Sequence, residues 1–114
     1  MRALPVLFAS FLLALVGCAS APTESQTGAG QQADAQRRAE IRLQLASAYF
    51  AEGQYATALA ELDQAYQTGQ RRADVLGLRA LVLAQQGDTA GAIRSLKQAL
   101  QTEPEHPGLL NNMG

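Results

Sequence analysis

Few side chains of this 114-residue chain could take part in making or breaking covalent bonds. His106 is the single histidine and lies in an expected turn, so a histidine relay or a histidine-based metal cluster cannot be built. Glu61 and Asp63 stand two apart, and on a helix that spacing directs the two carboxylates to different sides. We therefore predict a non-enzymatic protein with no catalytic residues, no metal, no cofactor and no small-molecule substrate.

Cys18, the single cysteine, is the side chain with a clear chemical role. It follows a charged start and an apolar run over residues 3–16, which has the length of an export-signal core and is too short to span a bilayer as a helix. The motif LVGC at residues 15–18 resembles a bacterial lipobox, and that resemblance implies cleavage before Cys18 and acylation of its sulfur. The alternative is an ordinary signal peptide, residues 1–17, with an incidental cysteine.

Lipidation of Cys18 predicts a protein that sits on a membrane surface without crossing it. Two or three acyl chains, as the lipobox resemblance implies, anchor a protein stably because each buried methylene contributes about 0.8 kcal/mol. In the Gram-negative families that the signal resembles, an Asp after the cysteine favours retention in the inner membrane, whereas this chain has Ala19. We therefore expect a lipid-anchored protein at the periplasmic face of the outer membrane.

The chain that remains after cleavage is weakly acidic. Loss of residues 1–17 removes one Arg, so nine basic residues become eight against ten acidic ones, a formal charge near −2. This balance argues against nucleic acid as a partner. Residues 19–33 contain no large apolar side chain and cannot form a core. We expect residues 18–35 to be the lipidated cysteine and a flexible tether.

The rest of the chain repeats itself with a period of 34 residues. A shift by that period places QRRAE at residues 36–40 on QRRAD at residues 70–74. Small residues also fall on small residues: Ala46 on Ala80, Gly53 on Gly87, and Ala58 on Ala92. Such a period with small residues at fixed places is the signature of tetratricopeptide repeats. Two ordinary amphipathic hairpins are the alternative.

The repeat predicts an all-α fold of tetratricopeptide-repeat helical hairpins, as in an α-solenoid. Residues 36–106 should form two full repeats, at about 39–72 and 73–106. Residues 107–114 open a third repeat, from which we expect the N-terminal portion of a longer protein, with a genuine short lipoprotein as the alternative. The apolar spacing predicts helices over residues 34–52, 54–67, 71–86 and 89–102.

Four residues of the first expected helix, Ile41, Leu45, Ala48 and Tyr49, are spaced three or four apart and predict one buried stripe. Gly53 and Gly87 should end helices at the turns, since a residue without Cβ does so cheaply. Asp88 is placed to cap the fourth helix, because its carboxylate can accept from free backbone N–H groups.

The particular residues of the repeats indicate a narrower family within the tetratricopeptide-repeat proteins. Three segments of the chain together resemble the PilF/PilW pilotin lipoproteins of type IV pilus biogenesis. They are RAEIRLQLASAYFAEGQYATALAELDQA, RRADVLGLRALVLAQQGD and EPEHPGLLNNMG. In that family an Asn-Asn-aromatic-Gly motif opens the third repeat, and here Met113 stands in place of the aromatic. The resemblance implies an outer-membrane lipoprotein that binds the secretin subunit and promotes its localisation and assembly.

A partner-binding surface is the remaining site that the pattern indicates. In tetratricopeptide arrays the first helix of each repeat lines a concave groove, and five residues should lie on it: Leu43, Ser47 and Phe50 in the first repeat, Leu81 and Gln85 in the second. Phe50 is either an apolar anchor for a partner or packs against the neighbouring repeat. A generic repeat lipoprotein that serves outer-membrane protein assembly or activates a cell-wall synthase is the alternative function.

Overall fold

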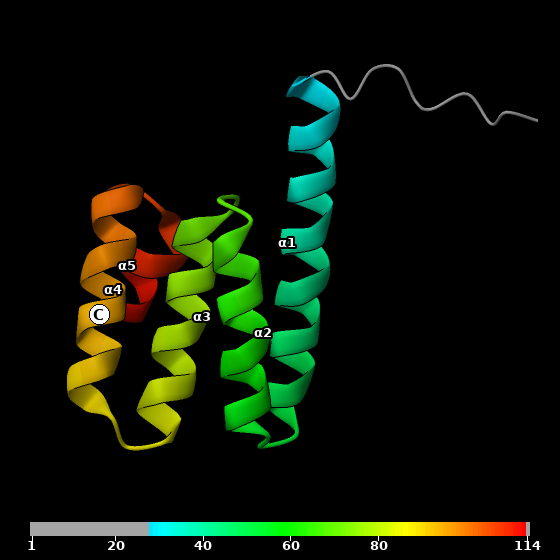
Figure 1. The fold of residues 1–114 in the computed structure, drawn as a ribbon. Coiled ribbons are helices and arrows are strands. Elements are labelled where there is room, and N and C mark those ends of the chain that lie inside the picture. Colours follow the sequence, from blue (N-terminus) through cyan, green and yellow to red (C-terminus); the bar gives the residue numbers. More distant parts are fainter. Residues whose placement is uncertain (1–27, 114) are drawn as a thin grey trace, which may run out of the picture.

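The computed structural model describes residues 28–113, which fold into helices joined by short turns. α1 pairs with α2 and α3 with α4 as antiparallel hairpins, the two hairpins stack side by side, and α5 starts a further layer (Figure 1). This arrangement confirms the expected all-α hairpins. The expected signal peptide and Cys18 lie outside the described residues. The helices are α1 (Gly28–Ala51), α2 (Tyr55–Gln67), α3 (Arg72–Gln85), α4 (Thr89–Thr102) and α5 (Pro107–Met113).

The start of α1 differs from the expectation. The helix begins at Gly28 and not at Asp34, so residues 28–33, expected in the tether, are helical and project beyond the other helices (Figure 1). The stretch contains two Ala and two Gln, which favour a helix, and two Gly, which do not, so the helical preference of residues 28–33 is mixed. The copy of the repeated motif at residues 36–40 therefore lies inside α1, whereas the copy at residues 70–74 spans the connection between the two hairpins and the first turn of α3. The other expected helix ends agree to within one residue.

The small residues of the repeat lie in the interior of the two hairpins. Ala46, Ala58, Ala80 and Ala92 are all buried, which confirms their expected role. A side chain of this size leaves the paired backbones close together, so a larger residue here would separate the hairpin.

The turns within the hairpins also follow the prediction. Gly53 and Gly87 have φ values of +74° and +82°, a left-handed conformation that other residues rarely adopt. Asp88 caps α4 as expected, since its Oδ1 accepts from the backbone N–H of Gly91 at 2.9 Å. Each hairpin therefore ends at a turn whose geometry the local sequence specifies.

The predicted buried stripe of α1 is wrong. Ile41 and Leu45 are 49% and 38% exposed, Ala48 is exposed, and Tyr49 is half-buried. Two apolar stripes run along α1. The stripe that α2 covers is the one that contains Leu43, because α2 supplies matching small residues on that side. The buried residues of α1 are Ala39, Leu43 and Ala46.

Two groups of buried side chains hold the hairpins together. The first joins α1 and α2 to one side of α3 through residues such as Leu62, Val75 and Val82. The second joins the other side of α3 to α4 and α5 and includes Leu76. Tyr66 packs against both groups. Within residues 28–113, no helix has the length and apolar character that a membrane span requires.

Leu109 is the large buried side chain through which α5 packs against α3. Leu109 is 2% exposed, and the place where a Cβ of Gly77 would stand lies 2.7 Å from its Cδ2 atom. Gly77 thus forms a notch in the middle of α3 that receives the Leu109 side chain. The absence of a side chain at residue 77 lets α5 reach α3.

Candidate partner-binding groove

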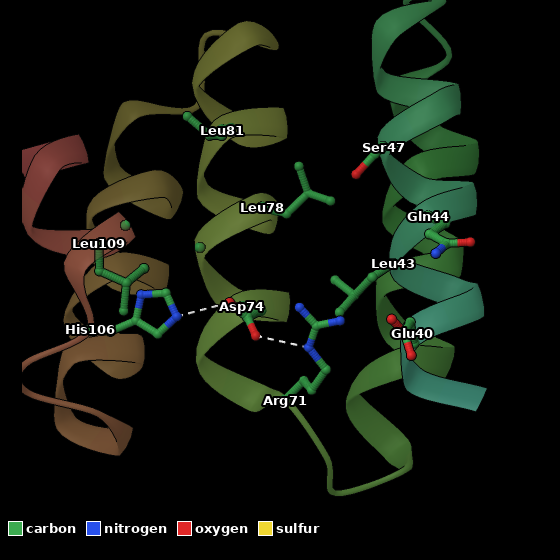
Figure 2. Close-up of a pocket in the computed structure, with 12 residues that line it drawn as sticks. Glu40, Leu43, Gln44, Ser47, Arg71, Asp74, Leu78, Leu81, His106 and Leu109 are labelled. Atoms are coloured by element: carbon green, nitrogen blue, oxygen red, sulfur yellow. Dashed lines mark hydrogen bonds and ion pairs between the residues drawn. The ribbon is translucent and has the colours of Figure 1, made fainter. Parts of the chain in front are cut away.

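A groove of about 520 Å³ runs along α3, between α1 on one side and α5 on the other. Figure 2 shows side chains from all three helices directed toward it. Its volume falls in the range typical of ligand sites. The lining residues are Glu40, Leu43, Gln44, Ser47, Arg71, Asp74, Gly77, Leu78, Leu81, His106, Gly108 and Leu109.

One end of the groove is polar and is organised around Asp74. The Nε of Arg71 donates to Oδ2 of Asp74 at 3.0 Å, and Nε2 of His106 lies 2.9 Å from Oδ1 (Figure 2). Because a carboxylate only accepts, His106 donates through its Nε2–H. Asp74 stands in the first turn of α3, where its charge also interacts favourably with the helix N-terminus. The three side chains form a chain of contacts that joins α3 to the start of α5.

The floor of the groove is apolar. Leu43 and Leu109 are buried, at 8% and 2% exposure, and Leu78 is half-buried. Leu81 is 40% exposed and offers part of its side chain to a partner. A partner's apolar group would therefore find its largest uncovered contact at the Leu81 end.

The wall that α1 contributes is polar. Glu40, Gln44 and Ser47 follow one another at helical spacing, so they share one face. All three are exposed. The amide of Gln44 and the hydroxyl of Ser47 can donate to and accept from the backbone of an extended chain. This wall suits the recognition of a peptide backbone.

Three of the five residues predicted for the groove line it. Leu43, Ser47 and Leu81 come together there from α1 and α3. Phe50 does not: its ring packs against Tyr55 at 5.9 Å between centroids and against the first buried group. Gln85 is exposed at the end of α3, outside the groove. The geometry thus favours the packing interpretation of Phe50 over the anchor interpretation.

Arg71, Asp74 and His106 are groove residues that sequence reasoning missed. His106 was expected in a turn, and the structure shows that it contacts Asp74, 32 residues earlier in the chain. This separation is close to one period of the repeat, so the single histidine stands near the register position of Asp74 in the next repeat. The repeat, applied to polar residues as well as apolar ones, was the signal that could have found the pair.

The arrangement is suited to binding. Within the described part of the chain, no group of three or more His, Cys, Asp or Glu side chains could hold a metal ion. The groove offers hydrogen-bonding groups on α1, charged groups at one end and uncovered aliphatic surface at the other. Such a combination fixes a polypeptide by its backbone and by the spacing of its side chains.

Comparison with known proteins agrees with this geometry. The sequence model of the tetratricopeptide repeat-like domain family matches residues 13–112. Neither the curated proteins nor the solved structures give a match. The domain is of a kind that serves as a scaffold for protein partners and is typically non-catalytic.

Proposed function

The chain belongs to the tetratricopeptide repeat-like domain family, and from that premise we propose that it is an outer-membrane scaffold lipoprotein of type IV pilus biogenesis. In this proposal a lipid on Cys18 holds the protein at the periplasmic face of the outer membrane. The groove along α3 binds a segment of the secretin subunit and promotes the localisation and assembly of that subunit.

The observation that carries the proposal is the groove itself. It combines an uncovered apolar contact at Leu81 with a wall of hydrogen-bonding side chains on α1, which is what a scaffold needs to hold an extended segment of a partner. The lipobox-like LVGC at residues 15–18 supports the membrane location. The pilotin-like wording at residues 103–114 supports the pilus assignment.

A matched pair of substitutions tests the groove in a piliated cell that lacks the gene. Leu81→Lys places a charge on the exposed leucine of the groove, and Ile93→Lys does the same at an exposed residue of α4. We expect the unmodified gene and the Ile93→Lys gene to restore secretin multimers and surface pili, and the Leu81→Lys gene to fail. The two substitutions change net charge equally, so a difference between them reports the groove.

Two outcomes would contradict the proposal. Full restoration of secretin multimers and surface pili by the Leu81→Lys gene would show that the function does not depend on the groove. Normal secretin multimers and normal twitching in the deletion strain would remove the pilus role, and the scaffold would then serve outer-membrane protein assembly or a cell-wall synthase.

The anchor is tested separately. Cys18→Ala should abolish labelling by a clickable fatty acid and release the protein from membranes. Ala19→Asp should move the labelled protein from the outer-membrane to the inner-membrane fraction. Undiminished labelling of Cys18→Ala would show that the lipid is attached elsewhere in the chain.

A further inference from the structure

The outer face of α1 has the residue spacing of a seam between two helices. Five exposed residues follow one another there at steps of three and four, so they form one line along the helix: Arg38, Ile41, Leu45, Ala48 and Glu52. α2 packs against the other side of α1, and Figure 1 shows α1 at the edge of the stack of helices. This line, which we call the α1 seam, is therefore uncovered in a single chain.

The two ends of the α1 seam have opposite charges. Arg38 stands seven residues before Leu45 and Glu52 stands seven residues after it, which is about 10.5 Å in each direction. Neither Arg38 nor Glu52 has an ion-pair partner within residues 28–113. The carboxylate of Glu52 accepts a hydrogen bond from the side-chain amide of Gln54 at 3.0 Å, which leaves its charge uncompensated.

The other charged residues of α1 do not change this pattern. Asp34 and Arg37 lie three residues apart near the arginine end, and their opposite charges cancel. Arg42 is paired with Glu61 of α2 at 2.7 Å. Glu40 lies on the side of α1 that lines the groove. The α1 seam is therefore positive at its N-terminal end and negative at its C-terminal end.

Two copies of the α1 seam fit each other when the helices run antiparallel. With Leu45 on the two-fold axis, Arg38 of each copy lies opposite Glu52 of the other, because both are seven residues from the axis. Ile41 of each copy then lies near Ala48 of the other. Parallel helices would instead place arginine beside arginine and glutamate beside glutamate, which is unfavourable. The seam thus complements itself in one orientation, as a two-fold symmetric interface requires.

We infer that the protein forms a dimer in which the α1 seams of two copies pack antiparallel. Steps of three and four residues are those of the a and d positions of a coiled coil, where side chains of facing helices interlock. The pairing would bury Ile41 and Leu45, which the sequence predicts to be buried and which a single chain leaves exposed. Two large apolar side chains from each copy make a small interface, so the dimer is reversible.

The dimer leaves the groove open. The α1 seam and the groove residues Gln44 and Ser47 lie on different sides of α1, since Ser47 is two residues from Leu45 and a helix turns by about 100° per residue. The inference therefore does not depend on the proposed function of the groove.

A membrane surface is the other occupant that an apolar helix face could have, and the α1 seam suits it poorly. Helices that lie in a membrane interface carry a broad apolar face with residues such as Trp, Phe and Leu. The seam has two large apolar side chains, Ile41 and Leu45, and it ends in the acid Glu52. A second copy, which brings Arg38 to that acid, is the better match.

The test is oxidative disulfide cross-linking of the full chain in detergent, in a Cys18→Ala background that gives each protein a single cysteine. Leu45→Cys places the thiol on the proposed axis and should cross-link with itself. Ser47→Cys, on the groove side of α1, is the matched control and should cross-link about tenfold more slowly. Ile41→Cys should cross-link with Ala48→Cys in a mixture and not with itself, because two copies of residue 41 would stand about 12 Å apart along antiparallel helices.

Charge substitutions test the orientation in the Leu45→Cys protein. Arg38→Glu or Glu52→Arg should each slow cross-linking about fivefold to tenfold, because two attractive pairs per dimer become repulsive. The double substitution should restore the rate. Arg94→Glu changes the net charge by the same amount as Arg38→Glu at an exposed residue of α4 and should have no effect. Failure of the double substitution to restore the rate would refute the antiparallel pairing.

Three further results would overturn the inference. Self-cross-linking of Ile41→Cys that is faster than its cross-linking with Ala48→Cys would show parallel helices. Equal rates for Leu45→Cys and Ser47→Cys would show random collision. A bimane label on Ala48→Cys reports the membrane alternative in vesicles of phosphatidylethanolamine and phosphatidylglycerol. Emission that shifts with lipid concentration at fixed protein concentration, without cross-linking of Leu45→Cys, would assign the α1 seam to the lipid surface.

Discussion

The contact between Gly77 and Leu109 makes a substitution at Gly77 a sensitive test of how α5 is held. An added Cβ would lie 2.7 Å from Cδ2 of Leu109, closer than side-chain atoms approach each other. Leu109 is almost fully buried among Ala73, Leu76 and Ala99, so its methyl group has little room to withdraw. Gly77→Ala should therefore disturb the seat of α5 on α3.

Two opposing terms set the size of the effect. Overpacking of a buried site costs about 1–3 kcal/mol. Replacement of glycine by alanine inside a helix stabilises the folded protein by about 1 kcal/mol. The net change in the free energy of unfolding is then a destabilisation of about 0–2 kcal/mol, which alone would be hard to interpret.

A second substitution makes the test decisive. Leu109→Ala removes the methyl groups that the new Cβ would meet, so in that background Gly77→Ala keeps the helix-propensity gain and loses the clash. Gly77→Ala should then stabilise the protein by about 1 kcal/mol, with a coupling of about 1–3 kcal/mol between the two sites.

The assay is chemical denaturation of the four proteins of this cycle, followed by far-UV circular dichroism. Hydrogen exchange of the α5 amides reports in parallel whether the helix leaves its seat. If Gly77→Ala stabilises the protein by the same amount with and without Leu109, the notch does not hold the leucine and the docking of α5 is misassigned.

Two further substitutions test the interior and the cap. Leu62→Ala should lower the free energy of unfolding by about 2–5 kcal/mol because the side chain is fully buried, whereas Ile41→Ala, at a half-exposed residue of α1, should change it by less than about 0.5–1 kcal/mol. A large loss at Ile41 would restore the stripe that the sequence predicted. Asp88→Ala should cost about 1 kcal/mol and speed amide exchange of Gly91, since the cap of α4 is removed; unchanged exchange at Gly91 would show that the cap is not formed in solution.

The hairpins could be predicted from the sequence because their signals are local and repeated. Ala46 and Ala80 occupy equivalent places and are both buried, and Gly53 and Gly87 both turn the chain through a positive φ. Each of these roles depends on neighbours within one repeat. A period of 34 residues therefore carries enough information to place them.

The face of α1 that packs inward could not be predicted in the same way. Both Leu43 and Leu45 have apolar neighbours at helical spacing, and the sequence of α1 alone does not say which of the two α2 covers. Leu43 became the buried one. The choice depends on where Ala58 and Leu62 come to lie across the hairpin, which is a tertiary contact.

The polar end of the groove escaped prediction for a similar reason. Arg71, Asp74 and His106 have ordinary surface residue types, and the contact of His106 with Asp74 depends on the docking of α5. The docking depends in turn on Gly77, a glycine inside a helix that the pattern would count only as a weak helix former. The groove residues Leu43, Ser47 and Leu81 could be predicted because helical spacing alone places them on the groove side of their helices.

Tyr66 couples the stability of the two repeats. Its ring packs against both groups of buried side chains, its hydroxyl accepts from Nε2 of Gln98 at 3.2 Å, and the guanidinium of Arg72 lies 5.0 Å from the ring centre. In a linear array, cooperativity is set by how the free energy of each nearest-neighbour interface compares with the intrinsic stability of one unit. A single aromatic residue that contributes to both units raises the interface term, so the loosening of one hairpin withdraws support from the other. We therefore expect the two hairpins to unfold in one cooperative transition, because unfolding of either hairpin removes the contacts of Tyr66 with the other.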